Sequence, residues 1–214
     1  LEVVGDAFTR TEQEGEGTYI NDQRMFLDRY GYLEEAFMTF SFAPIRDESG
    51  GVGGIFHPIT ETTVKILSGR RTHALRELGA ALGNTKSVQE ISLVALDKYA
   101  EYELDIPFLL CYQFNHEEGI AQLISTAGLP ADATLSPASV NLADNDMWSF
   151  SEVIETGNYL QLDGLEERFG EFSSGPYPES PRSALVLPLR ITGKEELFGI
   201  LVAGVSSRRS LDEE

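Results

Sequence analysis

Cysteine is nearly absent from this sequence. Cys111 is the only cysteine among 214 residues. A single thiol excludes an intrachain disulfide framework and any zinc site built on several cysteines. So little cysteine suits a reducing compartment. We therefore expect a cytoplasmic protein.

Basic residues are also scarce. The chain has 16 lysines and arginines against 35 acidic residues, for a formal net charge of −19. Proteins that bind nucleic acids neutralise phosphates with clustered basic side chains, and anionic membrane surfaces attract the same groups. No apolar run approaches the ~18 residues that cross a membrane, and we expect no signal peptide. We predict neither a nucleic-acid partner nor a membrane partner.

Apolar residues make up 42% of the chain, enough for a core in one large domain or two small ones. In the first block, residues 9–24 are polar and contain glycine, which predicts a loop. Alternation over Glu34–Pro44 predicts a half-buried strand, and Val52–Ile59 predicts its hairpin partner. Met25–Arg29 is a candidate third strand. Three strands lack cover, so we expect the C-terminal half of a domain that begins further upstream in a longer protein.

Helical spacing of apolar and small residues predicts a helix over Thr63–Leu82, ended by Gly83-Asn84. Its apolar stripe is narrow, close to a coiled-coil seam. Two interpretations stay open: an ordinary amphipathic connector, or a helix that pairs with a second copy and carries a signal. A capping box over Ser87–Glu90 predicts a second helix over residues 87–103.

The rest of the chain predicts two further hairpins with loops and a short helix between them. Residues 128–147 and 170–182 have loop composition, and Trp148–Thr156 is helical in pattern. The fold class is therefore α+β, with antiparallel sheets flanked by helices. The four predicted strands are Ile106–Phe114, Ile120–Ser125, Ala184–Leu189 and Leu197–Val205, with a turn at Thr192–Glu196 before the last.

Several stretches of the first half resemble the last strands of a PAS domain and the linker that follows such domains in histidine kinases. The stretches are Arg29–Glu35 (RYGYLEE), Phe40–Asp47 (FSFAPIRD), Gly51–Phe56 (GVGGIF), Thr60–Thr63 (TETT) and, in the linker, Arg70–Leu78 (RRTHALREL).

The second half resembles a GAF domain. The matching stretches are Asp105–Phe108 (DIPF), Arg168–Gly170 (RFG), Gly175–Pro178 (GPYP), Pro181–Leu189 (PRSALVLPL) and Gly199–Gly204 (GILVAG). The resemblance implies a C-terminal part of a PAS-like domain over 1–63, a linker or signalling helix over 64–83, a GAF domain over 84–207 and the start of a following segment over 208–214.

This resemblance implies a non-catalytic sensory and dimerising segment of a two-component signal-transduction histidine kinase. The GAF domain would sense a small molecule or partner, and the linker helix, paired in a homodimer, would relay the signal. The alternative is a ligand-free GAF module that only dimerises or docks other domains, in another regulator such as a phosphatase or a transcription regulator. No kinase catalytic core is recognisable in the sequence, and the cofactor is unknown.

GAF domains, by resemblance, bind ligands between the sheet and the loops on one face. Aromatic walls with a few polar anchors are what such a cavity needs, and Arg182 could hold an anionic group. The alternative is that these aromatic residues pack the core and Arg182 pairs with a local carboxylate. The candidate ligand-binding residues are Tyr112, Trp148, Phe150, Phe169, Tyr177, Arg182 and Leu187.

Other candidate chemistry is weak. His57, His73 and His116 share no metal-ligand spacing, and His57 lies at a predicted strand end rather than on a phospho-accepting helix. We interpret Cys111 as a buried, inert thiol on the opposite side of its strand from Tyr112. The pairs of adjacent acidic residues, such as Glu34-Glu35, are expected to be solvated. We predict no catalytic residue and no metal site.

Overall fold

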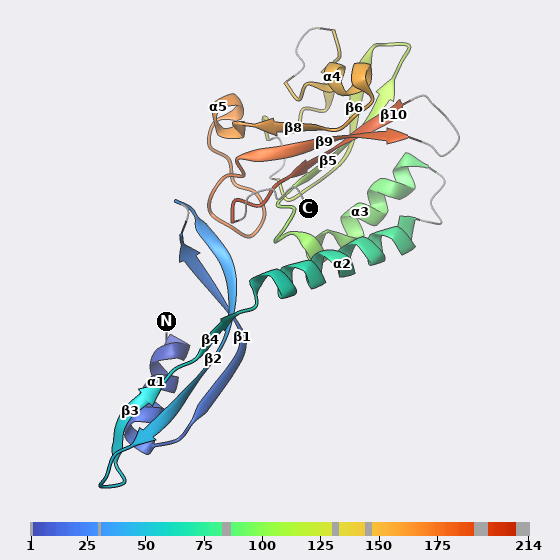
Figure 1. Cartoon of the computed structure of the whole chain (residues 1–214). Helices are drawn as coiled ribbons and strands as arrows, with labels where there is room; N and C mark the ends of the chain where they lie inside the picture. The colour runs from blue at the N-terminus through green and yellow to red at the C-terminus, as the bar shows by residue number, and fades with distance from the viewer. Residues whose placement is uncertain are drawn as a thin grey trace. The chain divides into compact units, whose positions relative to one another are not determined.

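The protein is described by a computed structural model of the whole chain (Figure 1). The chain divides into two compact units, Leu1–Arg70 and Arg71–Glu214, here called unit 1 and unit 2. No helix among the described residues is long and apolar enough to span a membrane. The residues that the structure describes are 2–29, 31–82, 87–129, 133–143, 147–190 and 197–208.

Unit 1 is an antiparallel sheet with one covering helix. The strand order is β1-β2-β3, and β4 also pairs with β2. The strand over Glu34–Pro44 is confirmed, with extensions at both ends. The elements of unit 1 are α1 (Glu2–Glu14), β1 (Thr18–Asp28), β2 (Leu33–Arg46), β3 (Val52–Phe56) and β4 (Ile59–Glu61), followed by the first part of α2 (Thr63–Leu82).

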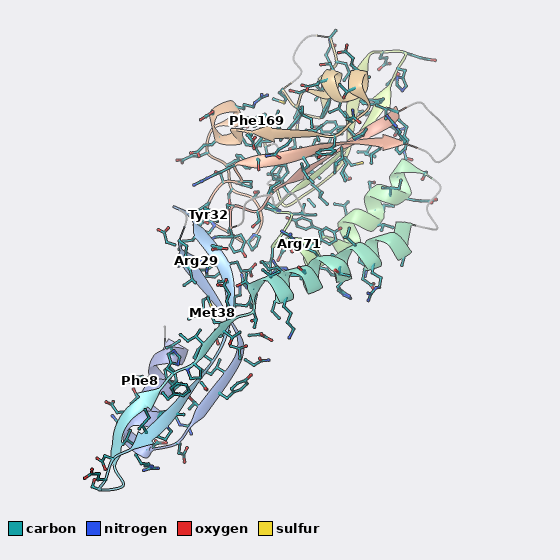
Figure 2. All side chains as sticks on the ribbon, in the orientation of Figure 1. Phe8, Arg29, Tyr32, Met38, Arg71 and Phe169 are labelled. Atoms are coloured by element: carbon teal, nitrogen blue, oxygen red, sulfur yellow. The ribbon has the colours of Figure 1, made fainter. Side chains whose placement is uncertain are left out.

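Helix α1 and the first part of strand β1 correct the prediction of a loop over residues 9–24. Helix α1 also supplies cover that the sequence did not reveal. Ala7 packs with Phe40 and Phe42 of β2, and the Phe8 ring meets Phe42 edge-on at 5.7 Å (Figure 2). The Thr11 hydroxyl, fully buried, donates to the Ala7 carbonyl oxygen at 3.0 Å. A threonine that satisfies its own hydroxyl inside the helix extends the buried stripe without an apolar residue.

The predicted strand Val52–Ile59 is divided in two. His57 and Pro58 lie between β3 and β4, and the Pro58 carbonyl accepts from the Ser41 amide at 3.2 Å. Proline has no N–H to donate to a ladder, so the strand is interrupted there. His57 stacks on Phe42 with the ring centroids 4.1 Å apart.

Unit 2 is one six-stranded antiparallel sheet with structure on both faces, which confirms the α+β class (Figure 1). The strand order is β7-β6-β5-β10-β9-β8. The elements, after the second part of α2, are α3 (Val88–Tyr102), β5 (Leu109–Asn115), β6 (Ile120–Ala127), β7 (Ser139–Asn141), α4 (Phe150–Thr156), β8 (Leu160–Asp163), α5 (Leu165–Phe169), β9 (Ser183–Arg190) and β10 (Leu197–Gly204).

The helices and hairpins of unit 2 were largely predicted. Ser87 is the N-cap of α3, with its hydroxyl accepting from the Glu90 amide at 3.2 Å, and Gly157 ends α4 in a left-handed conformation. Strand β7 corrects the expectation of an unbroken loop over 128–147, and β8 and α5 were not predicted. The predicted turns Gly83-Asn84 and Thr192–Glu196 lie outside the described residues.

Candidate functional site

One face of the unit 2 sheet carries the main core, and this is where most of the predicted site residues lie. Trp148 is fully buried, and its indole Nε1 donates to the Leu135 carbonyl oxygen at 2.9 Å. Its ring lies 4.7 Å from the ring of Phe169, at the end of α5 (Figure 2), and 6.2 Å from that of Phe108. The indole N–H of Trp148 is thus satisfied by protein.

Tyr112 and Phe150 fill the neighbouring part of this core. Both are fully buried, and their rings meet edge-on with centroids 5.1 Å apart. The Tyr112 hydroxyl donates to the Pro137 carbonyl oxygen at 3.1 Å, and burial raises the pKa of this phenol well above its usual range. The two polar groups in this core, the indole N–H and the phenol O–H, therefore both donate to backbone carbonyl oxygens.

The other three predicted residues are not brought together with Tyr112, Trp148, Phe150 and Phe169. Tyr177 is 7% exposed, and the Arg208 guanidinium carbon lies over its ring, 4.8 Å from the ring centroid. Arg182 is exposed and makes no ion pair with a described residue. Leu187 packs with Tyr102 and Leu109 on the opposite face of the sheet from Trp148.

The position of Leu187 follows from strand parity. On β9, Ala184 and Val186 belong to the Trp148 face, so Leu187 points to the other face. Alternation places residues of one strand in two sets, but it does not say which set faces which layer. Val186, which is fully buried, is the β9 residue that lies on the same face of the sheet as Tyr112.

Two surface grooves lie beside the loop 170–182. The first, with a volume of about 480 Å³, is acidic, and the Glu179 carboxylate in it accepts from Arg208 at 2.7 Å. It is lined by Glu166, Glu171, Phe172, Ser173, Pro178, Glu179 and Ser180.

The second groove, about 490 Å³ in volume, lies between the end of α3 and residues 173–176, and we call it the α3–loop groove. It is lined by Tyr99, Glu103, Gly128, Leu129, Ser173, Ser174, Gly175 and Pro176. None of the predicted site residues lines either groove. Both grooves depend on long-range packing of a glycine- and serine-rich loop, which sequence periodicity does not reveal.

The histidines are dispersed through the fold. His57 Nδ1 lies 2.8 Å from the Ser41 carbonyl oxygen, and His116 Nε2 lies 3.0 Å from that of Leu197. His73 is exposed on α2. No group of three or more histidine, cysteine, aspartate or glutamate side chains within the described part of the chain is placed to hold a metal ion.

Cys111 is buried in β5, and burial raises the pKa of its thiol to about 11. A thiol held in this way is a poor nucleophile near neutral pH, because the reactive form is the thiolate.

Glu34 and Glu35 correct the expectation that adjacent acidic residues are solvated. Glu35 is 4% exposed and pairs with Arg24 at 2.9 Å and with Arg70 at 2.8 Å, while Glu34 pairs with Arg29 at 2.8 Å. These ion pairs join elements within unit 1. The sequence feature that could have indicated them is the presence of Arg24, Arg29 and Arg70 as partners for the two carboxylates. The predicted pairs Glu195-Glu196 and Glu213-Glu214 lie outside the described residues.

The chain is similar in fold to solved GAF domains over about two thirds of its length. A GAF domain from an Acinetobacter phosphoenolpyruvate-protein phosphotransferase aligns with a TM-score of 0.46 and 16% identity, covering 67% of this chain and 81% of that one. The corresponding domain from Coxiella burnetii aligns with a TM-score of 0.47 and 16% identity, covering 68% and 83%.

A free methionine-R-sulfoxide reductase from Neisseria meningitidis, solved with its substrate, aligns with a TM-score of 0.45 and 14% identity, covering 66% of this chain and 77% of that one. No family model and no curated protein matches the sequence. These likenesses concern fold and assign no ligand or activity to this chain.

Proposed function

We propose that this chain is a non-catalytic sensory segment of a two-component signalling protein, most simply a histidine kinase, with a PAS-type unit 1 and a GAF-type unit 2. The proposal rests on one observation. Helix α2 is continuous over Thr63–Leu82, while the boundary between the two units falls within it, after Arg70. A helix that belongs to two folding units is suited to carry a change in one of them to the other.

The first part of α2 is built into unit 1. Leu67 is 2% exposed, and Arg70 pairs with Glu35 of β2. The Thr63 hydroxyl accepts from the Phe37 amide at 2.9 Å and donates to Glu61 at 2.9 Å, which joins the helix start to β2 and β4. Movement of this part of α2 would therefore disturb the unit 1 sheet.

The second part of α2 is built into unit 2. Ala74 packs with the cluster of Tyr102, Leu109 and Ala203 beneath the sheet, and Lys98 of α3 lies 3.9 Å from Glu77. A ligand that favours one arrangement of unit 2 would shift the population of α2 arrangements by its differential affinity for them. This relay needs binding and no chemistry, in keeping with the unreactive environment of Cys111.

The relay is tested by hydrogen exchange on the whole chain. Ala74→Arg should loosen the hold of unit 2 on α2, and we expect faster exchange at amides of residues 63–70 as well as in α3. Thr72→Arg, at an exposed position of the same helix, is the matched control and should leave both regions unchanged. Faster exchange confined to unit 2 in the Ala74→Arg variant would overturn the relay.

The second candidate function is a ligand-free dimerisation module. Val64 and Leu75 are 68% and 72% exposed on α2, eleven residues or about three turns apart, and so lie on one side of the helix. Native mass spectrometry of the purified chain separates the candidates. A retained small molecule supports the sensor, and a dimer at the bare sequence mass that Leu75→Arg dissociates supports the module.

A further inference from the structure

Two hydrogen bonds fix the backbone beneath the α3–loop groove. The Gly175 amide donates to the Gly128 carbonyl oxygen at 3.1 Å, and the Tyr99 hydroxyl donates to the Pro107 carbonyl oxygen. The first bond joins the loop before β9 to the end of β6, and the second joins α3 to the segment before β5. The groove is therefore a fixed feature of the unit 2 fold.

Two glycines make this close approach feasible. Gly128 has φ +75° and Gly175 has φ +62°, in the left-handed region that favours glycine. A Cβ on Gly128 would overlap the Tyr99 hydroxyl and the Pro107 carbonyl, and one on Gly175 would come within 2.9 Å of Pro107. The backbone thus approaches closely at the two positions that line the groove.

Ser174 places an unsatisfied polar group at this site. The residue is 3% exposed and is among those that line the groove. Its Oγ is itself shielded from solvent and has no hydrogen-bond partner among the described residues. Buried hydroxyls are almost always hydrogen-bonded, so an orphan at the wall of a groove points to a partner from outside the chain. A ligand in the groove would supply that partner once rotation about the Cα–Cβ bond of Ser174 turns the hydroxyl toward it.

The charge of the groove selects the kind of ligand. Among the described residues that line it, Glu103 is the one that carries a charge, and it makes no ion pair with a described residue. Burial first, and then the negative charge of Glu103, raise the pKa of Tyr99 to about 12. The Tyr99 ring, Leu129 and Pro176 offer apolar surface beside this carboxylate, and an aromatic face adds attraction for a cation.

We propose that the α3–loop groove binds a small organic ammonium ion. The ammonium lies against the Glu103 carboxylate and donates to Ser174 Oγ, and the hydrocarbon part covers Tyr99 and Leu129. A groove of about 490 Å³ has the size of a small-molecule site. The inference concerns a site in unit 2 alone and does not depend on the relay through α2.

The test is a titration of the ¹⁵N-labelled whole chain with phenethylammonium chloride at constant ionic strength, followed by amide NMR. Two probes of matched shape, neutral 2-phenylethanol and anionic phenylacetate, test the charge, and ammonium chloride tests charge without a hydrocarbon part. We expect saturable shifts at the Gly128, Ser174 and Gly175 amides with phenethylammonium, and binding at least about tenfold weaker for the other three.

Variants complete the experiment. Glu103→Gln should weaken phenethylammonium binding by about tenfold or more, and Ser174→Ala should weaken it severalfold. Ser173→Tyr should block the groove, whereas Glu117→Gln, an exposed carboxylate of the β5–β6 turn, is the matched control and should bind as the parent does. Trp148 fluorescence verifies folding in each case.

The proposal is overturned if phenethylammonium gives no saturable shift, if the alcohol binds equally well, or if Glu103→Gln and Glu117→Gln behave alike. Since the readout lies entirely in unit 2, none of these results would bear on hydrogen exchange in unit 1, which tests the relay separately.

Discussion

Arg70 contacts both carboxylate oxygens of Glu35, with Nη2 2.8 Å from Oε2 and Nη1 3.3 Å from Oε1. Arg24 Nε lies 2.9 Å from the same carboxylate, whose side chain is 5% exposed. A buried carboxylate between two arginines joins strand β2 to helix α2 within unit 1. Such a pair is costly to break from one side, because the remaining charge stays buried.

Arg70→Ala should therefore lower the free energy of unfolding of unit 1 by about 2–4 kcal/mol. The measurement is hydrogen exchange of the β2 amides at increasing urea. Arg10→Ala is the matched control, since Arg10 pairs with Glu14 and Glu16 at an exposed site, with its side chain 58% exposed. It should cost less than about 1 kcal/mol. Equal effects of the two substitutions would refute the structural role assigned to Glu35.

Acidification should weaken unit 1 through Glu61. Its pKa lies below its usual range, first because Arg29 donates to it, at 2.9 and 3.0 Å, and next because Thr63 donates to it. A carboxyl with a lowered folded-state pKa contributes stability that is full above its unfolded pKa and is lost as the pH falls through its folded pKa. The free energy of unfolding should thus decline below about pH 4.

Glu61→Gln provides the check on this pH dependence. Urea unfolding of unit 1 is measured from neutral to acidic pH. The free energy of unfolding should be lower at pH 7 in the variant than in the parent, and it should decline less steeply as the pH falls. Asp47, whose pKa is also lowered, first by the Ser49 hydroxyl, keeps its own contribution in the variant. An unaltered slope would show that the Arg29 pair contributes nothing.

The sequence predicted many of the longer elements, but helix α1 and the first part of strand β1 were missed despite their length. Helix α2 was placed at Thr63–Leu82 as observed, and the β9–β10 hairpin was recognised from its apolar runs. Short or interrupted elements escaped. Strand β7 has three residues and β8 has four, too few for alternation to stand out, and Pro58 divides a run that otherwise alternates.

The candidate site was predicted less well, for a physical reason. Trp148, Phe150 and Tyr112 do lie in one core cluster, since aromatic residues gather in cores. Composition does not say whether the polar tip of such a side chain faces a ligand or a backbone carbonyl. Leu135 and Pro137 supply those carbonyls from a loop without periodicity. The groove at Ser174 depends likewise on loop geometry set by Gly128 and Gly175.

Glycines offer a matched pair for stability. Gly69 lies in helix α2 with nothing within 4 Å of where a Cβ would be, so Gly69→Ala should stabilise the chain by about 0.5–1 kcal/mol. Gly128→Ala should destabilise it, because of its positive φ and the overlap with Tyr99 and Pro107. Urea unfolding followed by circular dichroism measures both. A loss of stability in Gly69→Ala would indicate contacts of α2 with a second molecule.

Cys111 should be unreactive in the folded protein. Its thiol is 3% exposed and has a pKa of about 11, so little thiolate forms at pH 8. Labelling with a thiol-reactive disulfide reagent should be slow in buffer and complete in urea. Fast labelling of the folded chain would show that β5 opens readily, and would reopen the question of thiol chemistry.

Trp148 distinguishes a packed core from a ligand wall. In a packed core, Trp148→Phe leaves a cavity and deprives the Leu135 carbonyl of its donor, so the free energy of unfolding should fall by about 2–4 kcal/mol. In a ligand wall, the substitution would alter binding and leave stability nearly unchanged.

Arg182→Gln, at an exposed position, is the control and should change stability by less than about 0.5 kcal/mol. Urea unfolding monitored by circular dichroism, which does not need the tryptophan signal, measures both variants. Full burial of Trp148 and the satisfied indole N–H favour the first outcome. A stable Trp148→Phe variant would return the aromatic cluster to consideration as a ligand site, in competition with the α3–loop groove.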